Sequence, residues 1–485
     1  MGEGILFGLI CFLSRIYHVT LLPIFTDESI YIYWAKHIQT LHDDWFISLY
    51  DGKPPIFIWL IATFLSFFPS TWYLFAGRLV SVLASVGTIL GIYSISMVLF
   101  NDKRVARISS FVYIITPFSY VYDRLALFDS LFTTMLVWTV YFMFKTANSY
   151  SYKHAMLWGG FLGLAFLVKP PALIFFLLTP VCFFVLVRGN LGIKRMVFLL
   201  LPVVLISWGM NSLLRVSGNY QAMVVKNAQF QLSLIELFRN PFQLLLKNLS
   251  LFFHWIYIYY TLPIFLVGIL SFILLVRYKP RIGSVFLLLW GASILMIGLI
   301  GKVVFPRYLV FLTPYVVIPI GFLIAEVAHE FKGLHRRYLS GLSLLLLPPF
   351  IFIFTFARFP SEAKLPNDDY DQFVSSYTSG YGLEPVFTYL ERESRDKKII
   401  LITEGTFGLF PYAFELQFRN NPNMQIISRE KIEFIDPELY ALKSPHTFFV
   451  FQKHQYVPGG LLLKEIVRGE KPMKDRNPII LATFL

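Results

Sequence analysis

Charged residues are scarce in this chain of 485 residues, and cysteine is almost absent. Asp, Glu, Lys and Arg together make up 15% of the sequence, whereas 56% is hydrophobic and 51 residues are Phe. Soluble domains carry about 25% charged residues, so the composition excludes a soluble globule and predicts a chain that crosses a membrane many times. The two cysteines, Cys11 and Cys182, both lie in apolar runs. They exclude a disulfide framework and a cysteine-based metal site.

The sequence also lacks a glycine-rich phosphate loop, internal repeats and low-complexity segments. Its formal net charge is nevertheless +13. The basic residues stand in short clusters between apolar runs rather than on one soluble face. We therefore assign the excess positive charge to membrane lipids as partners and not to nucleic acid.

Eleven apolar runs approach the length of about 20 residues that a membrane-spanning helix needs. They lie at about 5–24, 78–100, 105–122, 130–144, 155–168, 172–187, 196–214, 252–276, 284–301, 309–330 and 339–357. A further run at 56–68 is too short to span comfortably, and we expect it to lie in the membrane interface.

Basic residues favour the cytoplasmic side of a membrane, and this rule orients the eleven runs. Alternate connections are basic, for example around Arg104, Arg188 and Arg277. The rule predicts an integral plasma-membrane protein with a cytoplasmic N-terminus and an outward C-terminal part. The opening residues 1–25 lack a basic start and a clear cleavage site, so we expect a retained first span rather than a signal peptide.

The composition changes at about residue 358, where long apolar runs end and charged residues, Gly and Pro return. We predict a transmembrane domain at 1–357, in which 25–77 forms an outer loop with interfacial helices, and a small extracytoplasmic α/β domain at 358–485. In this second domain the pattern predicts one helix and four strands. They lie at 382–395 for the helix and at 399–402, 425–428, 447–452 and 479–485 for the strands.

The first outward segment carries two adjacent acids, Asp27 and Glu28. They follow Thr26, a candidate N-cap, so they would occupy the first turn of a helix, where the helix dipole favours negative charge. Apolar residues then recur at helical spacing. We expect the face with Tyr31, Trp34, Ile38 and Leu41 to lie on the bilayer, and the face with Lys36, Gln39 and Asp43 to point to water.

The outward turns hold more cations than the positive-inside rule predicts. The cations are Lys53 before Pro54-Pro55, Arg124 in a turn that ends at Asp129, Lys169 before Pro170-Pro171, Lys302, and Arg307 between Pro306 and Tyr308. A single cation at a helix end is commonly an anchor that reaches the interface. Several cations and carboxylates at one membrane face indicate a site.

Cations at this position suit a phosphate attached to a lipid, because charge-assisted donors stabilise the phosphate as it leaves. A nearby carboxylate suits deprotonation of an acceptor hydroxyl or amine. The combination describes transfer of a sugar from a polyprenyl-phosphate donor. Such a leaving group needs no nucleotide-binding fold.

These motifs resemble the GT-C superfamily of membrane glycosyltransferases, in particular the protein O-mannosyltransferase and aminoarabinose-transferase branch (glycosyltransferase families 39 and 83). The matching residues are Asp27-Glu28, Lys53-Pro54-Pro55, Arg124 through Asp129, Lys169-Pro170, and Pro306-Arg307-Tyr308-Leu309 with Pro314. They cover about the first 320 residues. The resemblance implies an α-helical polytopic fold with about eleven transmembrane helices, and makes 1–357 its catalytic domain.

The resemblance also implies roles for individual residues. Asp27 would be the catalytic base of an inverting displacement at the anomeric carbon, and Glu28 and Asp129 would orient the acceptor or tune Asp27. The donor phosphate would be bound by Lys53, Arg124, Lys169, Arg307 and Tyr308.

The sequence leaves four points open: the sugar, the acceptor, the use of a metal ion and an alternative function. The sugar is unnamed, and the acceptor is a lipid, a glycan or a protein, although the chain has no room for the inserted lumenal domain of eukaryotic protein mannosyltransferases. No cofactor is assigned; a divalent metal ion is an alternative, with Asp27, Glu28 and His254 as its candidate ligands. A lipid-linked sugar flippase is the alternative function, although such transporters place charges at mid-membrane and often show repeated halves.

Overall fold

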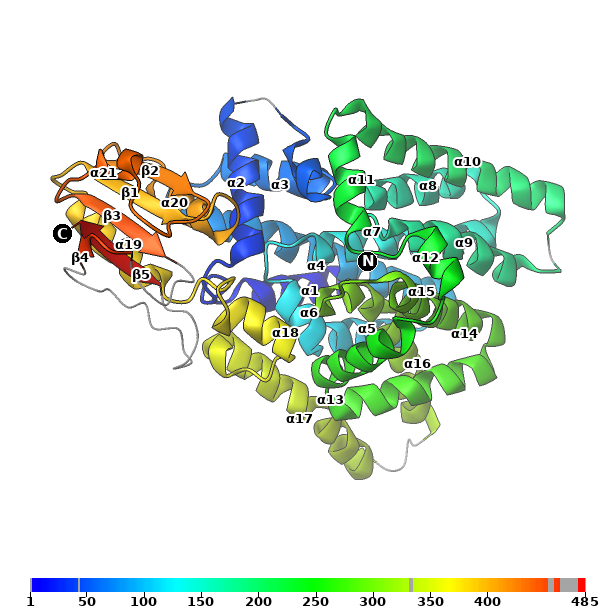
Figure 1. Ribbon diagram of the computed structural model, residues 1–485. Helices are drawn as coiled ribbons and strands as arrows, with labels where there is room; N and C mark the ends of the chain where they lie inside the picture. Colours follow the sequence, from blue (N-terminus) through cyan, green and yellow to red (C-terminus); the bar gives the residue numbers. More distant parts are fainter. Residues whose placement is uncertain are drawn as a thin grey trace. The chain divides into compact units, whose positions relative to one another are not determined.

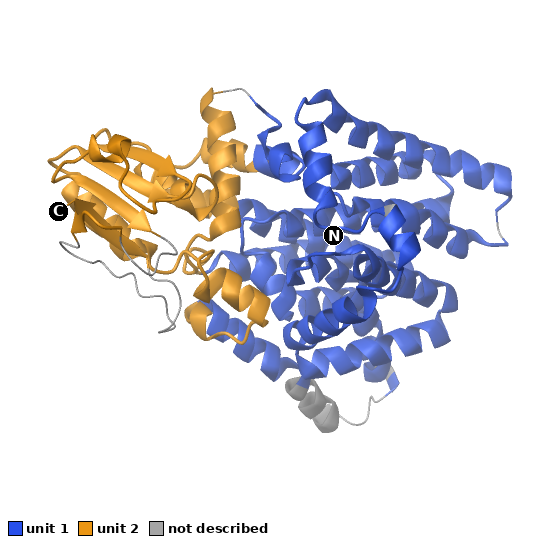
Figure 2. Ribbon diagram, in the orientation of Figure 1, with its two compact units in different colours: residues 1–17, 44–59, 78–357 blue, residues 18–43, 60–77, 358–485 orange. Residues whose placement is uncertain are grey.

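The computed structural model describes residues 2–41, 44–189, 191–330, 335–451, 458–462 and 479–484. Most of them are helical, and a five-stranded sheet forms from the C-terminal part of the chain (Figure 1). The chain divides into two compact units (Figure 2). Unit 1 comprises residues 1–17, 44–59 and 78–357, and unit 2 comprises residues 18–43, 60–77 and 358–485. Three residues of the segments predicted from the sequence lie outside the described residues: Asp43, Gln452 and Leu485.

Unit 1 is built from helices. They are α1 (Gly2–Ile16), η1 (Ile47–Asp51), α5 (Lys103–Ile115), α6 (Pro117–Tyr122), α7 (Phe128–Ser149), α8 (Tyr152–Phe166), α9 (Ala172–Val187), α10 (Ile193–Ser212), η3 (Leu213–Val216), α11 (Tyr220–Ala228), α12 (Leu234–Arg239), α13 (Leu245–Tyr278), α14 (Pro280–Leu287), η4 (Leu288–Ala292), α15 (Ser293–Ile300), η5 (Pro306–Leu312), α16 (Thr313–Glu330) and α17 (His335–Arg358). Two further helices, α3 (Ile56–Leu65) and α4 (Tyr73–Phe100), run from one unit into the other.

Five segments within the described residues are long and apolar enough to cross a membrane, judged by length and composition. They are Ser70–Phe100, Ile193–Val216, Leu245–Tyr278, Pro280–Ile300 and Pro306–Ala328. Ten of the eleven apolar runs lie mainly on helices, whereas the first, 5–24, continues for eight residues beyond the end of α1 at Ile16. The run at 56–68 forms α3, whose ten residues are too few to cross a bilayer.

Small residues allow helices of unit 1 to pack closely. A Cβ added at Gly321 of α16 would lie 2.0 Å from Oγ of Ser109 of α5. Such an approach requires a glycine, as is common where helices pack inside a membrane.

Helix α13 is not continuous. Thr261 has φ 59° and ψ 154°, which is non-helical, and Pro263 follows within the same helix. Proline lacks a backbone N–H and its ring collides with the carbonyl four residues earlier, so a break at this point has a local cause in the sequence.

Unit 2 combines an early helix with the C-terminal part of the chain. Its helices are α2 (Thr26–Leu41), η2 (Ser70–Trp72), η6 (Pro360–Glu362), α18 (Asn367–Tyr370), η7 (Asp371–Ser375), α19 (Leu383–Glu393), α20 (Leu409–Phe418) and α21 (Pro437–Tyr440). Its strands are β1 (Ile399–Glu404), β2 (Met424–Arg429), β3 (Thr447–Phe451), β4 (Leu461–Leu462) and β5 (Ile480–Phe484). The helix and the strands predicted from residue 382 onward thus lie at the expected places.

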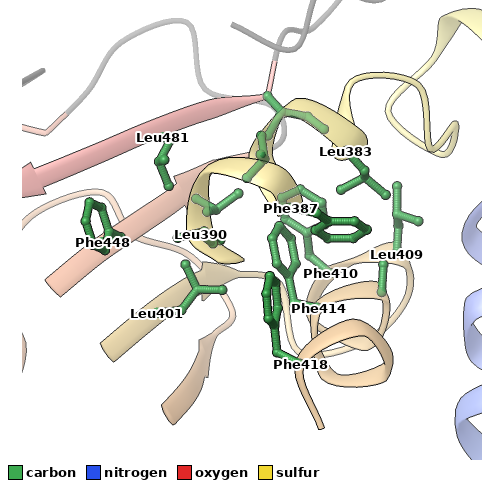
Figure 3. Packing of buried hydrophobic residues seen from close by; sticks show 14 of the residues in the cluster. Leu383, Phe387, Leu390, Leu401, Leu409, Phe410, Phe414, Phe418, Phe448 and Leu481 are labelled. Carbon is green, nitrogen blue, oxygen red and sulfur yellow. The ribbon is translucent and has the colours of Figure 1, made fainter. Parts of the chain in front are cut away.

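The sheet has the order β2-β1-β3-β5-β4. Strands β2 and β3 pair in parallel with β1, whereas β5 pairs antiparallel with β3 and β4. One face packs against α19 and α20 through a cluster that includes Phe387, Phe414 and Phe448 (Figure 3). The other face buries Phe449 together with Leu439 of α21. Burial on both faces matches the apolar character of β1 and β3.

The expectation for the faces of the first helix was wrong in part. Tyr31, Trp34 and Ile38 of α2 are 3% exposed or less, so this face is buried in protein instead of lying on the bilayer; Leu41 is 54% exposed. Part of what covers the helix is α20, which is more than 360 residues away in the sequence, so local periodicity gave no indication of it. The helix itself begins at Thr26, which is therefore the first helical residue and not the cap.

Candidate active site

A pocket of about 250 Å³ lies within unit 1. Most of its lining is apolar, and includes Phe132, Ile174, Met296, Ile300 and Phe311. Its polar lining residues are Lys53, Lys169, Asn227, Gln231 and Tyr308. A largely apolar pocket with a few convergent polar groups is the usual form of a ligand site.

The short helix η1 and the glycine after it position Lys53. Gly52 has φ +77°, a conformation that favours glycine, and its N–H donates to the Leu49 carbonyl at 3.0 Å. The Lys53 N–H donates to the Ser48 carbonyl at 3.0 Å. The Lys53 Nζ lies 3.9 Å from the Asp51 carboxylate and 5.8 Å from the centre of the Phe230 ring. The turn therefore places this cation at the pocket.

Lys169 is held between an acid and an aromatic ring. Its backbone N–H donates to Ala165 at the end of α8, and its Nζ donates to Oδ1 of Asp129 at 2.6 Å. The same Nζ lies 4.8 Å from the centre of the Tyr308 ring. Burial lowers the pKa of Lys169, and the Asp129 carboxylate acts in the opposite direction. The ion pair thus offsets part of the cost of burying this cation.

Arg307 and Tyr308 lie together in η5. Arg307 stacks over the Phe305 ring at 4.9 Å, and the Tyr308 N–H donates to the Phe305 carbonyl at 3.0 Å. The charges of Arg307 and Lys53 both act on Lys169. Four predicted donor-binding residues, Lys53, Lys169, Arg307 and Tyr308, are thus brought together with Asp129 in unit 1.

Arg124 has a different environment. Its guanidinium donates to the Tyr120 hydroxyl and lies over the Tyr120 ring. The neighbouring Asp123 forms a buried ion pair with Arg15 at 3.4 Å. Arg124 is not among the residues that line the pocket. Its contacts with the Tyr120 hydroxyl and ring thus differ from those of the two lysines that line the pocket.

Sequence reasoning missed the segment that closes the pocket on one side. Residues 230–232 run beside 300–302: the Leu232 N–H donates to the Ile300 carbonyl at 2.7 Å, and the Lys302 N–H donates to the Phe230 carbonyl at 2.9 Å. Asn227 donates to the Gly52 carbonyl at 3.2 Å, which ties this segment to the Lys53 turn. The outward loop at 215–251 carries no motif that would have indicated these contacts.

Lys302 forms an ion pair with Glu236. Its Nζ lies 3.0 Å from the Glu236 carboxylate, and both side chains are largely open to solvent. A backbone N–H from Ser233 and the Lys302 cation lower the pKa of Glu236 to about 2. This pair is a surface ion pair, in line with the anchoring role that a lone cation commonly has.

The predicted acid pair belongs to unit 2. Asp27 and Glu28 lie in the first turn of α2, where unsatisfied backbone N–H groups favour negative charge. Consecutive helical residues point about 100° apart, and the two acids differ accordingly. Glu28 is fully buried, whereas Asp27 is partly exposed. Of the two, Asp27 is the more open to a substrate.

No three side chains of His, Cys, Asp or Glu gather to form a metal-binding group within the described ranges. His254 lies in α13 of unit 1, and Asp27 and Glu28 lie in α2 of unit 2. The alternative with a metal ion at these three residues stays a prediction.

Residues 52–209 match the model of the family described as dolichyl-phosphate-mannose-protein mannosyltransferase. The fold is similar to that of ArnT from Cupriavidus metallidurans bound to undecaprenyl phosphate, with a TM-score of 0.61, 13% sequence identity, and coverage of 99% of this chain and 98% of that chain. The apo state of the same protein matches with a TM-score of 0.53 and 14% identity, over 89% of this chain and 86% of that chain. No curated protein sequence matches the chain. The family match confirms the resemblance to protein mannosyltransferases over residues 52–209, and the two ArnT structures show a similar fold.

Proposed function

We propose that this protein transfers a sugar from a polyprenyl-phosphate donor to a lipid, glycan or protein acceptor at the outer face of the membrane. One observation carries the proposal: the pocket of unit 1 joins two lysines and a tyrosine to an apolar lining. The matched family model and the fold similarity support the same class of reaction.

The pocket fits both parts of such a donor. Lys53, Lys169 and the Tyr308 hydroxyl supply donors for phosphate oxygens, and Arg307 adds positive charge nearby. The isoprenoid chain would contact the apolar lining, where each buried CH₂ contributes about 0.8 kcal/mol. We also propose that Arg124 binds the donor phosphate, as its motif predicts.

The proposed reaction is a single displacement with inversion. Asp27 takes the proton of the acceptor hydroxyl or amine as the acceptor attacks the anomeric carbon. The bond between that carbon and the phosphate oxygen breaks, and the polyprenyl phosphate leaves with the electron pair. Lys53, Lys169 and Arg307 stabilise the developing negative charge. Glu28 supports Asp27, and Asp129 holds Lys169 through the 2.6 Å ion pair.

The membrane topology is part of the proposal. We infer eleven spans, a cytoplasmic N-terminus and an extracytoplasmic α/β domain at 358–485. Cysteine replacements at exposed Gly192 and Lys443 test it, because the two native cysteines are buried. An impermeant thiol reagent should label Lys443→Cys but not Gly192→Cys in intact cells, and both after permeabilisation. Labelling at position 192 in intact cells would reverse the topology.

A divalent cation at Asp27, Glu28 or His254 is a separate proposal. Dialysis against a chelator, followed by readdition of Mg²⁺, Mn²⁺ or Zn²⁺, tests it directly. Activity that falls on dialysis and returns with one ion supports a metal; unchanged activity after complete chelation removes the proposal.

The function itself is tested with purified protein in lipid nanodiscs. A polyprenyl-phosphate donor with a labelled sugar is added with a membrane lipid or glycan extract as acceptor source. Transfer of label to a new product, with release of polyprenyl phosphate, supports the glycosyltransferase. For the alternative of a flippase, the same donor is followed in sealed vesicles, where an intact donor that appears on the other leaflet without transfer would overturn our proposal.

A further inference from the structure

The first turn of α2, which carries Asp27 and Glu28, is held by residues from the far end of the chain. The backbone N–H and the hydroxyl of Thr26 both donate to the carbonyl of Thr378, at 2.9 Å and 3.1 Å. A carbonyl that accepts two bonds from the residue before Asp27 fixes the start of the helix. These groups all belong to unit 2.

The same turn of the C-terminal segment lies against the residues that precede the helix. A Cβ added at Gly380 would lie 1.8 Å from the carbonyl oxygen of Ile24, so no larger residue fits without a backbone shift. Phe25 packs edge-on against Phe373, with ring centres 4.9 Å apart. The approach of backbone to backbone leaves little freedom for the chain that enters α2.

A second contact comes from the carboxyl end of β1. Strand β1 pairs in parallel with β2 on one side and with β3 on the other, so the strand order reverses beside β1. In open α/β sheets, ligands usually bind at the carboxyl ends of the strands where the order reverses. The loop that follows at 405–408 contacts α2 here: Ser29 Oγ lies 3.3 Å from the Gly408 carbonyl. Gly405 and Gly408 have φ of +100° and +111°, so the loop conformation itself requires glycine.

Further along, α20 fixes the rotation of α2 about its axis. Tyr33 and Tyr412 stack with ring centres 4.0 Å apart and planes within 10°. Tyr33 also bonds to the Glu415 carboxylate, and burial raises the pKa of Glu415. Arg419 donates to the Thr40 hydroxyl at 3.1 Å near the end of the helix. The helix is therefore held at its start, on its side and near its end.

We propose that the C-terminal α/β segment is the positioning element for the acid pair, with Thr378, Gly380, Gly408 and Tyr412 as its positioning residues. This inference rests on the proposed function, because it assigns them to the orientation of the proposed base Asp27. None of the four needs to contact donor or acceptor. In many α/β folds this edge of the sheet binds a ligand. In this protein it contacts α2.

The geometry makes the effect large. A carboxylate roughly 6 Å from the helix axis moves by about 2 Å when the helix rotates by about 20°. A misplacement of about 1 Å at a reacting group costs about 100-fold in rate. Loss of one positioning contact should therefore lower kcat and leave donor binding unchanged.

The first experiment compares two glycine replacements in the full-length protein in nanodiscs. Gly380→Ala forces the close approach to Ile24 apart, whereas Gly459→Ala adds a methyl group where nothing lies within 4 Å. We expect Gly380→Ala to lower kcat about 10- to 100-fold with an unchanged KM for the polyprenyl-phosphate sugar, and Gly459→Ala to match the wild type. A wild-type kcat for a folded Gly380→Ala variant would overturn the inference.

The second experiment replaces the stacked tyrosine and does not depend on the folding of Gly380→Ala. Tyr412→Phe keeps an aromatic ring on Tyr33, and Tyr412→Leu removes it. In Tyr412→Leu we expect kcat to fall about tenfold, and we expect a shift in the limb of the kcat pH profile that reports the base. In Tyr412→Phe, kcat and the pH profile should both match the wild type. Equal loss in the two variants, or a loss confined to KM, would contradict a positioning role.

The activity of the wild type distinguishes failure of the proposed function from failure of the positioning inference. If wild-type protein transfers no sugar from any polyprenyl-phosphate donor, the proposed function fails. If the wild type transfers sugar and Gly380→Ala and Tyr412→Leu do so equally well, the function stands and the positioning inference fails.

Discussion

The cation pocket of unit 1 and the acid helix of unit 2 are built in different ways. In unit 1, Lys53, Lys169 and Arg307 each stand beside a proline in a short turn. Backbone bonds to near neighbours position Lys53 and Lys169. In unit 2 the helix with Asp27 depends on partners about 350 residues away, such as Thr378. Local motifs can thus encode the placement of a cation, whereas the orientation of the proposed base Asp27 depends on the folded unit.

Asp27→Asn should give the largest effect of the single replacements, because it removes the proposed base of unit 2. The amide keeps the shape of the side chain but accepts no proton, so we expect sugar transfer to fall by about 100- to 10,000-fold with donor affinity intact. Single-turnover transfer at saturating donor measures the chemical step. Glu28→Gln is the matched control and should lose less. Full activity of Asp27→Asn would move the base to Glu28 or Asp129.

Removal of a pocket cation should act on donor use. Lys53→Ala or Arg307→Ala removes a charge-assisted bond worth roughly 1.5 to 3 kcal/mol, which corresponds to a drop of about 10- to 100-fold in kcat/KM at low donor concentration. Initial rates over a range of donor concentrations measure it. Wild-type rates in both variants at sub-saturating donor would show that these residues only anchor the chain in the interface.

Asp129→Asn distinguishes two roles for this acid. If Asp129 holds Lys169, as the 2.6 Å ion pair indicates, the variant should raise the donor KM about three- to tenfold and change kcat little. If it instead tunes Asp27, kcat should fall and its pH profile should shift. A full donor titration at several pH values tells the two outcomes apart.

Lys302→Ala should have the smallest effect and serves as the matched cation control. Its ion pair with Glu236 is exposed, and such pairs contribute about 0 to 1 kcal/mol. We expect donor KM and kcat within about twofold of the wild type. A loss of kcat/KM as large as that in Lys53→Ala would show that Lys302 also belongs to the phosphate site.

Local signals in the sequence predicted much of this structure. Ten of the eleven apolar runs lie mainly on helices, and Lys53, Lys169 and Arg307 each stand in a turn beside a proline. Strand positions near 399 and 425 also followed from short β-branched runs. Each of these features depends on neighbours within a few residues, which is why one sequence was enough.

Features that depend on distant residues could not be predicted. Nothing near Tyr33 in the sequence indicates its stack on Tyr412, so the apolar face of α2 was assigned to the bilayer. Asn227 and Gln231 belong to a loop without a motif, and only the folded chain brings them to the pocket.

The break in α13 has a consequence for how the protein matches the thickness of its membrane. A straight helix of 34 residues would be roughly 51 Å long, against about 30 Å for the hydrocarbon core of a bilayer. The non-helical geometry at Thr261 divides it near its middle, so each half is shorter than that core. The two halves can then run in different directions, so that a kink accommodates the excess length instead of a tilt of the whole helix or a thicker bilayer.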